Sequence, residues 1–377
     1  MTVSTRYRLV ACALAAAVLG GCGGGSAHAP VPPSLPALSP AELAGQRVIY
    51  SYGGLTPPAG LLDLIRHGEA AGVIFFGGNI ASTAQIAGVI SEFDRANASP
   101  DNPLRALPLL LMTDQEGGAV RRLPGAPLLS ERQIGASADP GAEAANAGTG
   151  AGQTLAGVGM NVNLAPVLDV YRAPGDFDDQ FGRSYSSDPG TVSALGAAFI
   201  TAQQAAGVAA TAKHFPGLGT ATSSQNTDEQ PVTLYVSRDD LRSIDEHPFQ
   251  AAIASGVKLV MMSWAVYPVL DPRWPAGLSS AIIGGELRQR LGFTGVTITD
   301  ALEAGALQAF GTTGQRATLA ARAGMDLILC SGQSLDEGEQ ARLALQEGLG
   351  HGTLDRAAFT AAVGRIVSLR SSLHVHG

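Results

Sequence analysis

Residues 209–231 read AATAKHFPGLGTATSSQNTDEQP, and they decide the fold predicted for the rest of the chain. The stretch begins with a short apolar run, AATA, and turns at once into the charged pair Lys213 and His214. Small apolar residues that end in a cation and an imidazole indicate a buried parallel strand that delivers side chains to a site at its C-terminal end. Pro216 and Gly217 then break the strand, so the long polar loop after them is expected to cross the mouth of that site.

The same alternation of a short apolar run and a longer amphipathic segment continues through most of the chain. Expected strands cover residues 47–50, 72–76, 108–113, 161–164, 209–212, 258–262, 295–299 and 326–329. Expected helices include residues 83–96, 141–157, 189–206, 239–254 and 315–323. Eight short strands, each followed by a helix-length segment, predict a single-domain (β/α)8 barrel of the TIM type over residues 41–377. A doubly wound open sheet is the alternative, and polar residues at nearly every strand end favour the barrel.

The composition of the chain argues against several classes of function. The chain of 377 residues carries a formal net charge of -8, which argues against a phosphate-binding surface and therefore against nucleic acid as a partner. It contains no phosphate-cradling GxGxxG or Walker sequence, and neither a metal nor an organic cofactor is implied. Cys330 is the one cysteine outside the N-terminal leader, so we expect no disulfide within the mature domain and a small, buried role for this residue.

The first 40 residues have the layout of an export and anchoring signal. Two arginines precede a short apolar stretch, residues 9–19, which is too short to span a membrane stably and is typical of a signal peptide over residues 1–21. The stretch ends in LGGC, which resembles the bacterial lipobox, so we expect Cys22 to be lipidated and to anchor the protein to the membrane outside the cytoplasm. Residues 22–40 are rich in Pro, Gly and Ser and are expected to form a disordered tether. If Cys22 is incidental, the protein is secreted instead.

Polar side chains gather where the expected strands end. In a (β/α)8 barrel these ends meet on one face, where the loops carry the reacting groups. The residues at these ends are Asp114, Gln115, Glu116, Asp169, Arg183, Lys213, His214, Ser263, Trp264 and Asp300. Carboxylates and cations that converge on one mouth suit a polyol or sugar, because they bind hydroxyl groups through charge-assisted hydrogen bonds. Trp264 either packs against a sugar ring or belongs to the core.

Five segments, in this order, resemble glycoside hydrolase family 3, most closely the single-domain β-N-acetylglucosaminidases of bacteria. They are TDQEGGAVRR (residues 113–122), NLAPVLDV (163–170), FGRSYSSDP (181–189), KHFPG (213–217) and TDAL (299–302). The resemblance covers nearly the whole chain from residue 41, and the shared order of the motifs makes it specific. It implies a barrel-shaped glycosidase that acts on a carbohydrate substrate.

The resemblance also implies roles for individual residues. Asp300 matches the nucleophile of the family, a carboxylate that attacks the anomeric carbon and forms a covalent glycosyl-enzyme with net retention. Lys213, His214 and Arg183 match residues that hold the sugar, and Asp114 matches a carboxylate that binds a hydroxyl group away from the reaction. The alternatives are structural: a helix cap for Asp300, and ion pairs at the barrel mouth for the other four.

The loop after KHFPG departs from the family at the group that should protonate the leaving oxygen. Retaining hydrolysis needs such a group, which later activates water. The resemblance places an Asp-Ser-His segment there, with the His as acid/base. Counting along the loop from either end puts Ser224 and Asn226, or Gln225 and Thr227, at the two outer positions of that segment. The Asp-His pair is absent in either register.

Three explanations for this departure stay open. In the first, Asp228 or Glu229 of the same loop serves as a carboxylate acid/base, which requires a mobile loop to swing Asp228 over the glycosidic oxygen. In the second, the acid is missing, which leaves a slow enzyme or a sugar-binding lipoprotein, since general acid–base catalysis typically contributes about 10²–10⁴-fold. In the third, the altered loop serves another acceptor or glycoside. Asp228 also fits a structural role, capping a turn within residues 225–229.

On this basis the sequence predicts a lipid-anchored, extracytoplasmic, retaining glycosidase. We expect it to act as a monomer that removes terminal β-linked N-acetylhexosamine from cell-wall (peptidoglycan) fragments. The residues expected to act are Asp300 as nucleophile, Asp228 as provisional acid/base, and Asp114, Arg183, Lys213 and His214 as sugar-binding side chains. The alternatives are a glycan-binding lipoprotein built on an inactive hydrolase barrel, or a family 3 enzyme for a different glycoside or acceptor.

Overall fold

Eight parallel strands form the centre of the structure, a computed structural model that describes Met1 and residues 37–373. The strands are β1 (Val48–Tyr50), β2 (Gly72–Ile74), β3 (Leu110–Thr113), β6 (Val162–Asn163), β7 (Ala209–Phe215), β8 (Leu259–Met262), β11 (Val296–Thr299) and β12 (Ile328–Leu329). They pair in the order β11-β8-β7-β6-β3-β2-β1-β12, so each strand lies beside its neighbours in the chain. A bridge between Ile298 of β11 and Leu327, next to β12, joins the two end strands. The predicted (β/α)8 barrel is therefore confirmed.

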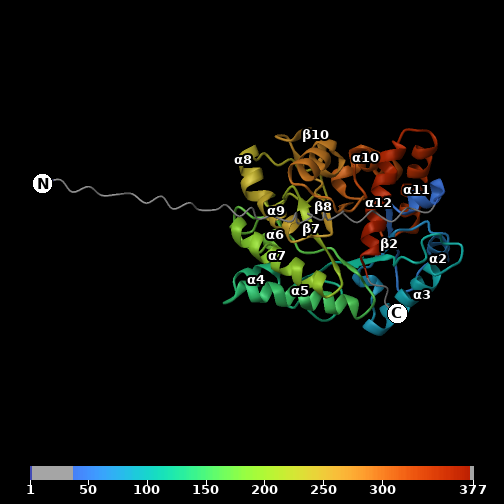
Figure 1. The fold of residues 1–377 in the computed structure, drawn as a ribbon, viewed down its shortest axis with the longest axis horizontal. Coiled ribbons are helices and arrows are strands. Elements are labelled where there is room, and N and C mark those ends of the chain that lie inside the picture. The colour runs from blue at the N-terminus through green and yellow to red at the C-terminus, as the bar shows by residue number, and fades with distance from the viewer. Residues whose placement is uncertain (2–36, 374–377) are drawn as a thin grey trace. The chain divides into compact units, whose positions relative to one another are not determined.

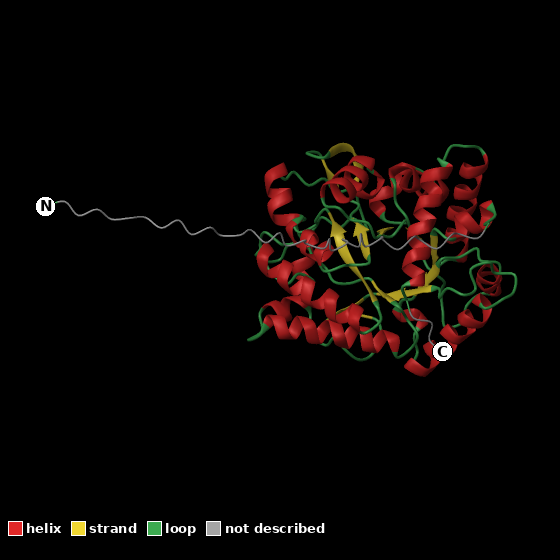
Figure 2. Cartoon of the chain, in the orientation of Figure 1, coloured by secondary structure: helices red, strands yellow, loops and turns green. Residues whose placement is uncertain are grey.

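Helices surround these strands, as Figure 2 shows. The longer ones between barrel strands are α2 (Ala59–Arg66), α3 (Thr83–Asn97), α5 (Pro140–Ala156), α7 (Pro189–Ala205), α9 (His247–Ala254), η4 (Ala281–Arg290) and α10 (Thr313–Ala323). Short helical segments are η1 (Gly77–Asn79), α4 (Glu131–Gly135), α6 (Phe177–Gln180), α8 (Arg238–Asp240), η2 (Leu241–Asp245), η3 (Ala276–Leu278) and η5 (Gly305–Phe310). Helix α1 (Pro40–Gly45) precedes the barrel, and α11 (Leu335–Gly350) and α12 (Arg356–Ser371) follow it.

Two apolar clusters pack on opposite faces of the barrel sheet. Ile49 and Met261 belong to an inner cluster that fills the barrel, whereas their neighbours Tyr50 and Val260 belong to an outer cluster under the helices. This alternation follows from the strand, in which successive side chains point to opposite faces. Because both faces are buried, the strands have the nearly continuous apolar sequence from which the barrel was predicted.

Helix α12 closes the end of the barrel where the strands begin. Its residues Ile366 and Leu369 belong to the inner apolar cluster. The guanidinium group of Arg370 is fully buried and donates hydrogen bonds to the carbonyl oxygens of Leu107 and Pro108, just before β3. The opposite end, where the strands finish, is left for the connecting loops. Two of these loops form antiparallel hairpins, β4–β5 (Gln115–Gly117 and Val120–Arg121) and β9–β10 (Val266–Tyr267 and Asp271–Pro275).

Helices α5 and α7 run side by side in Figure 1, and small residues allow their close approach. A side chain on Gly148 of α5 would place its Cβ 2.3 Å from the carbonyl oxygen of Phe199 in α7. A side chain on Gly152 would come within 2.6 Å of Ala206 Cβ. The Ala- and Gly-rich sequence of these helices is therefore a packing requirement of the outer layer.

The region predicted as one helix over residues 239–254 consists of three pieces. Helix α8 is followed by the wider π-helical turn η2, and α9 begins at His247. Pro248 explains the break, because proline has no N–H to donate and its ring clashes with the carbonyl four residues earlier in a regular helix. Two other predicted helices, 83–96 and 141–157, agree with α3 and α5 to within one residue at each end.

The predicted signal peptide, Cys22 and most of the predicted tether lie outside the described residues. Ser39 caps helix α1, since its hydroxyl accepts the N–H of Glu42. No helix in residues 37–373 has the length and apolar character needed to cross a bilayer.

Candidate active site

A cavity of about 370 Å³ lies at the end of the barrel where the strands finish. Its wall contains every residue predicted to act on the substrate: Asp114, Arg183, Lys213, His214, Asp228 and Asp300. Asp114 directly follows β3 and Asp300 directly follows β11, whereas Lys213 and His214 belong to the last part of β7. The volume is near the lower end of the ~300–1,000 Å³ typical of small-molecule sites. The cavity therefore suits one sugar unit better than a long segment of glycan.

A network of two cations and two carboxylates forms one wall of the cavity. The ammonium group of Lys213 lies 2.9 Å from Asp114 Oδ1 and 2.7 Å from Glu116 Oε1. The guanidinium group of Arg183 donates two hydrogen bonds of 2.9 Å to the oxygens of Glu116. Burial alone would raise the pKa of Glu116, but the adjacent Arg183 and Lys213 lower it to about 2. Glu116 therefore stays ionised and fixes both cations, so these residues are ion-paired and also line the cavity.

Strand β7 runs to Phe215 and not to residue 212, where it was predicted to end, because the charge of Lys213 has partners within the barrel. Lys213 is 3% exposed in its side chain, and a buried ammonium is tolerated only with partners. Its partners Asp114 and Glu116 are about a hundred residues away in sequence and reach it from β3 and the hairpin that follows. The strand can therefore continue through a charged residue that would ordinarily end it.

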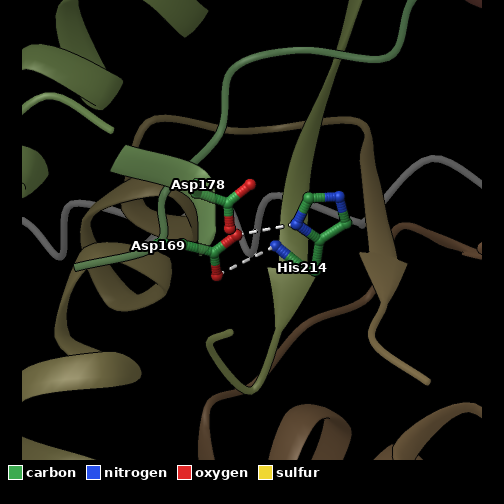
Figure 3. A group of neighbouring side chains, drawn as sticks. All are labelled: Asp169, Asp178 and His214. Carbon is green, nitrogen blue, oxygen red and sulfur yellow. Dashed lines mark hydrogen bonds and ion pairs between the residues drawn. The ribbon is translucent and has the colours of Figure 1, made fainter. Parts of the chain in front are cut away.

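The side chain of His214, which follows Lys213 in β7, is held by a buried hydrogen bond to Asp169. The Nδ1 atom of His214 lies 2.7 Å from Asp169 Oδ2, and Asp169 Oδ1 accepts the N–H of Leu218 at 2.6 Å. Figure 3 shows the other ring nitrogen of His214 pointing away from both neighbouring carboxyl groups. Burial lowers the pKa of His214, but the charge and hydrogen bond of Asp169 outweigh this and raise the pKa overall. Asp169 thus orients the imidazole, and the Nε2 atom has no hydrogen-bond partner among the described residues.

Asp178 lies beside Asp169 in Figure 3 and shares its buried position. Its Oδ1 accepts a hydrogen bond of 2.9 Å from Arg183. Burial raises the pKa of Asp178, and the nearby charge of Asp169 adds to this against the opposing effect of Arg183, so that the pKa is about 7. Asp178 is therefore about half protonated at neutral pH, which reduces the repulsion between the two buried carboxyl groups.

Asp169, Asp178 and His214 also have the spacing of a metal site, since one donor atom from each lies within 4.8 Å of the others. Four of the six possible donor atoms are already engaged: His214 Nδ1 with Asp169 Oδ2, Asp169 Oδ1 with the N–H of Leu218, and Asp178 Oδ1 with Arg183. A bound cation would have to displace these bonds and lie next to the Arg183 guanidinium. The donor set therefore fits a hydrogen-bonded network better than a metal ion.

Asp300 stands on a rigid turn directly after β11. Its Oδ1 accepts the N–H of Ala301 at 2.7 Å, and the carbonyl of Ala301 accepts the indole N–H of Trp264 at 2.8 Å. No helix begins at Ala301, because the next helical segment, η5, starts at Gly305 with Ala304 as its cap. The structural alternative of a helix-capping Asp300 is therefore wrong. Trp264 is 1% exposed and supports the turn from the core. Of its two predicted roles, packing against a sugar ring or belonging to the core, it therefore has the second.

Asp228 is held beside the Asp300 turn by backbone hydrogen bonds. The N–H of Gly305 donates to the carbonyl of Asp228 at 2.7 Å, and the N–H of Ala306 donates to the carbonyl of Thr227 at 3.0 Å. A Cβ atom on Gly305 would lie 2.1 Å from the carbonyl oxygen of Glu229, so the contact requires glycine. The prediction assumed a loop that swings Asp228 into place, whereas here the residue is already fixed at the cavity.

The electrostatic setting of Asp228 suits a group that carries a proton near neutral pH. Asp228 is exposed on the rim, but burial of its carboxyl group on the cavity side and the charge of Asp300 raise its pKa to about 6. The turn that contains it is closed by Asn226, whose side-chain oxygen accepts the N–H of Asp228 at 3.0 Å. The side chain of Asp228 is therefore not needed to cap this turn.

Hydrogen bonds at both ends brace the rest of the loop over the cavity. The N–H of Phe177 donates to the carbonyl of Ala221 at 2.9 Å, and the side chain of Gln180 donates to Ser223 at 3.0 Å. The hydroxyl of Tyr267 donates to the carbonyl of Gly217 at 2.8 Å. The loop after β7 thus crosses the mouth of the cavity, as its sequence predicted.

Several residues at the cavity were not predicted to act there. Glu303 lines the wall and accepts a hydrogen bond of 2.7 Å from Ser331. Behind it, burial and the charge of Glu303 raise the pKa of Glu337 to about 8. Phe177 also lines the wall. Two features of the sequence could have indicated these residues. Glu303 lies three residues after Asp300, and Phe177 and Asp178 belong to the acidic run FDDQ.

Known proteins resemble this chain over most of its length. The sequence model of the glycosyl hydrolase family 3 N terminal domain matches residues 55–369. An uncharacterized secreted glycosyl hydrolase of Arthroderma benhamiae is 46% identical over 338 residues, which cover 89% of this chain and 95% of that protein. A beta-hexosaminidase of Stenotrophomonas maltophilia is 35% identical over 285 residues, which cover 73% of this chain and 80% of the other. The solved structure of a glycoside hydrolase family 3 beta-N-acetylglucosaminidase from Paenibacillus superposes with a TM-score of 0.83 at 35% identity, and covers 89% of this chain and 63% of that one.

Proposed function

Because this chain belongs to glycoside hydrolase family 3, we propose that it removes terminal β-linked N-acetylhexosamine with net retention, through a covalent intermediate on Asp300. The family resemblance stated from sequence motifs is confirmed, and the chain is a glycosidase related to the β-N-acetylglucosaminidases. The identity of the sugar, the order of the chemical steps and the role of each residue are parts of the proposal.

In the first step, a carboxylate oxygen of Asp300 attacks the anomeric carbon while the bond to the leaving oxygen breaks. Asp228 gives its proton to that oxygen, so the aglycone departs as a neutral alcohol. In the second step, the Asp228 carboxylate takes a proton from water, whose oxygen attacks the anomeric carbon and releases Asp300. A pKa near 6 allows Asp228 to serve both as acid and as base.

The wall formed by Lys213, Arg183 and Asp114 holds the sugar during these steps. The two cations donate hydrogen bonds to hydroxyl groups, and a carboxylate accepts from them. His214, oriented by Asp169, presents its free ring nitrogen to another hydroxyl. Because ion pairs fix these side chains before substrate arrives, little conformational freedom is lost on binding.

The observation that carries this proposal is that Asp300 and Asp228 face one cavity and that backbone bonds join their two segments. Their environments also differ, as two catalytic carboxyl groups with distinct roles require. Asp300 accepts a backbone N–H, whereas the pKa of Asp228 is raised by burial and by Asp300 itself.

Hydrolysis of a chromogenic N-acetyl-β-glucosaminide tests the proposal. We expect turnover by the wild-type protein and its loss in the Asp300→Asn variant, which keeps the shape of the side chain but not its charge. Binding of N-acetylglucosamine without any turnover in the wild type would instead identify a glycan-binding protein on an inactive barrel. Turnover that survives Asp300→Asn would refute the assigned nucleophile.

The proposal extends to where the protein acts. The relative from Arthroderma benhamiae is a secreted glycosyl hydrolase, which supports export of this chain. We further propose anchoring through a lipid on Cys22, action as a monomer, and cell-wall fragments as the source of substrate. Fractionation of cells that express the full chain tests the anchor: wild-type protein should be in the membrane fraction and the Cys22→Ala variant should be soluble. Wild-type protein that is already soluble would contradict the anchor.

A further inference from the structure

Three exposed apolar residues, Phe181, Leu128 and Leu129, come from two segments that meet beside the cavity. Phe181 is 52% exposed, Leu128 is 68% exposed and Leu129 is 38% exposed. The other exposed large apolar residues in the described chain are Met1, Leu55, Tyr235 and Leu343. Single exposed apolar residues are ordinary, whereas a group beside a cavity indicates a binding surface.

Backbone contacts place these residues next to one another. The N–H of Arg132 donates to the carbonyl of Gly182, which follows Phe181, at 3.1 Å. The N–H of Gly118 donates to the carbonyl of Leu128 at 3.3 Å. The segments that hold Phe181 and the two leucines therefore meet between the β4–β5 hairpin and α6.

Phe177 connects this surface to the cavity. Its ring lines the cavity wall and is 9% exposed. The ring of Phe181 packs edge-on against it, with 5.7 Å between ring centres and 79° between ring planes. The apolar surface is thus continuous with the site where the glycosidic bond is expected to be cut.

The exposed ring of Phe181 is held in place by its segment. The N–H of Phe177 is bonded to Ala221, and the side chain of Gln180 is bonded to Ser223. On the other side of Phe181, Arg183 is bonded to both Glu116 and Asp178. The bonds to Ala221 and Ser223 tie this segment to the loop that carries Asp228, the proposed acid, from whose side the leaving group is expected to depart.

We propose that Phe181, flanked by Leu128 and Leu129, binds the aglycone sugar of the substrate, a second β-linked N-acetylhexosamine. The inference rests on the proposed function. A cavity of about 370 Å³ takes one sugar, so the next sugar must lie on the rim. The C–H face of a pyranose ring is apolar and packs on an aromatic face, whereas the sector around Asp228 and Glu303 is acidic and costs more to desolvate.

Kinetics with two substrates that share the same first sugar test this subsite. N,N′-diacetylchitobiose carries an aglycone sugar, and N-acetyl-β-glucosaminyl fluoride does not. The variant Phe181→Ala should lower kcat/KM for the disaccharide by about three- to tenfold, chiefly through KM, and leave the fluoride unchanged. Phe181→Tyr should restore the wild-type ratio, whereas Phe181→Leu, which is apolar but has no ring, should not.

Tyr235→Ala is the matched control, since it removes another exposed aromatic ring, 89% exposed and outside the cavity wall. It should leave kcat/KM unchanged for both substrates. If the ratio of kcat/KM for the disaccharide to kcat/KM for the fluoride is the same in Phe181→Ala as in the wild type, the proposed subsite is refuted, while the proposed function stands. If the wild type hydrolyses neither substrate, the proposed function fails, and calorimetry then tests the subsite alone: Phe181→Ala must weaken binding of the disaccharide but not of N-acetylglucosamine.

Discussion

Replacing Gly305 by alanine tests whether the docked position of Asp228 is needed for catalysis. The new Cβ would lie 2.1 Å from the carbonyl oxygen of Glu229 and 2.2 Å from its carbonyl carbon. Ordinary contacts between such atoms are near 3.5 Å, so the two segments must separate by roughly 1–1.5 Å. A shift of that size in a catalytic group can cost about 10²-fold in rate.

The expected loss depends on the leaving group. With N,N′-diacetylchitobiose, whose leaving oxygen needs a proton, kcat/KM should fall about 10²-fold in Gly305→Ala. With a dinitrophenyl glycoside, which leaves without protonation, the loss should be less than about tenfold. Overpacking of this kind typically costs about 1–3 kcal/mol of folding free energy, so thermal unfolding must show that the variant is folded at the assay temperature.

Gly284→Ala provides the control, because a Cβ at that position meets nothing within 4 Å. This variant should match the wild type with both substrates. Equal losses on both substrates in Gly305→Ala would mean that the displaced group is not the acid. Full activity on both would mean that the contact between residues 227–229 and η5 has no part in catalysis.

The remaining predictions concern pH. The raised pKa of Asp228 means that its carboxyl group keeps its proton up to pH about 6, so the rate of disaccharide hydrolysis should decline as pH rises through about 6. The variant Asp228→Asn should lose this pH dependence and hydrolyse the disaccharide about 10²–10⁴-fold more slowly. A wild-type rate that is flat between pH 5 and 8 contradicts the assignment. The pKa of Glu116 is lowered from 4.5 to about 2, so its ionisation stabilises the folded protein above pH 4.5 by about 3 kcal/mol, and this is lost as pH falls toward 2. Urea unfolding should therefore show Glu116→Gln well below the wild type at pH 7, with the difference shrinking in acid; a difference that is constant with pH refutes this reasoning.

The strands were predictable because both faces of each are buried, which leaves apolar runs that stand out in the sequence. The end of β7 was not predictable from the pattern, because the strand continues through Lys213. That residue is tolerated only because Asp114 and Glu116 reach it from a distant part of the chain. Where such a strand ends depends on ion pairs between residues far apart in the sequence, and the local pattern of apolar residues does not show these pairs.

The membership of the site was largely predictable, because a barrel brings the ends of all its strands to one face. Asp114 and Asp300 stand directly after strands, and both line the cavity as expected. Their roles, like those of the other four predicted residues, stay predictions. Asp178 and Glu303 were missed because they come from a four-residue helix and a turn, both too short for a period to relate sequence to position.

The position of Asp228 illustrates a second limit of the sequence. The loop could be aligned with the family in two registers, and neither gave an acid. The structure fixes Asp228 through backbone atoms and through the absence of a side chain on Gly305, neither of which depends on the chemical character of the loop residues. Contacts of this kind are decided by the fold of two segments together.

The most direct test of the central claim is to trap the sugar on Asp300. A 5-fluoro analogue of N-acetyl-β-glucosaminyl fluoride forms a glycosyl-enzyme that hydrolyses slowly, and trypsin then releases residues 291–316, which contain Asp300. Mass spectrometry with fragmentation should place the added sugar on Asp300 and not on Glu303 of the same peptide, and Asp300→Asn should carry no label. A label on another residue, or unlabelled protein that continues to turn over substrate, would contradict the account.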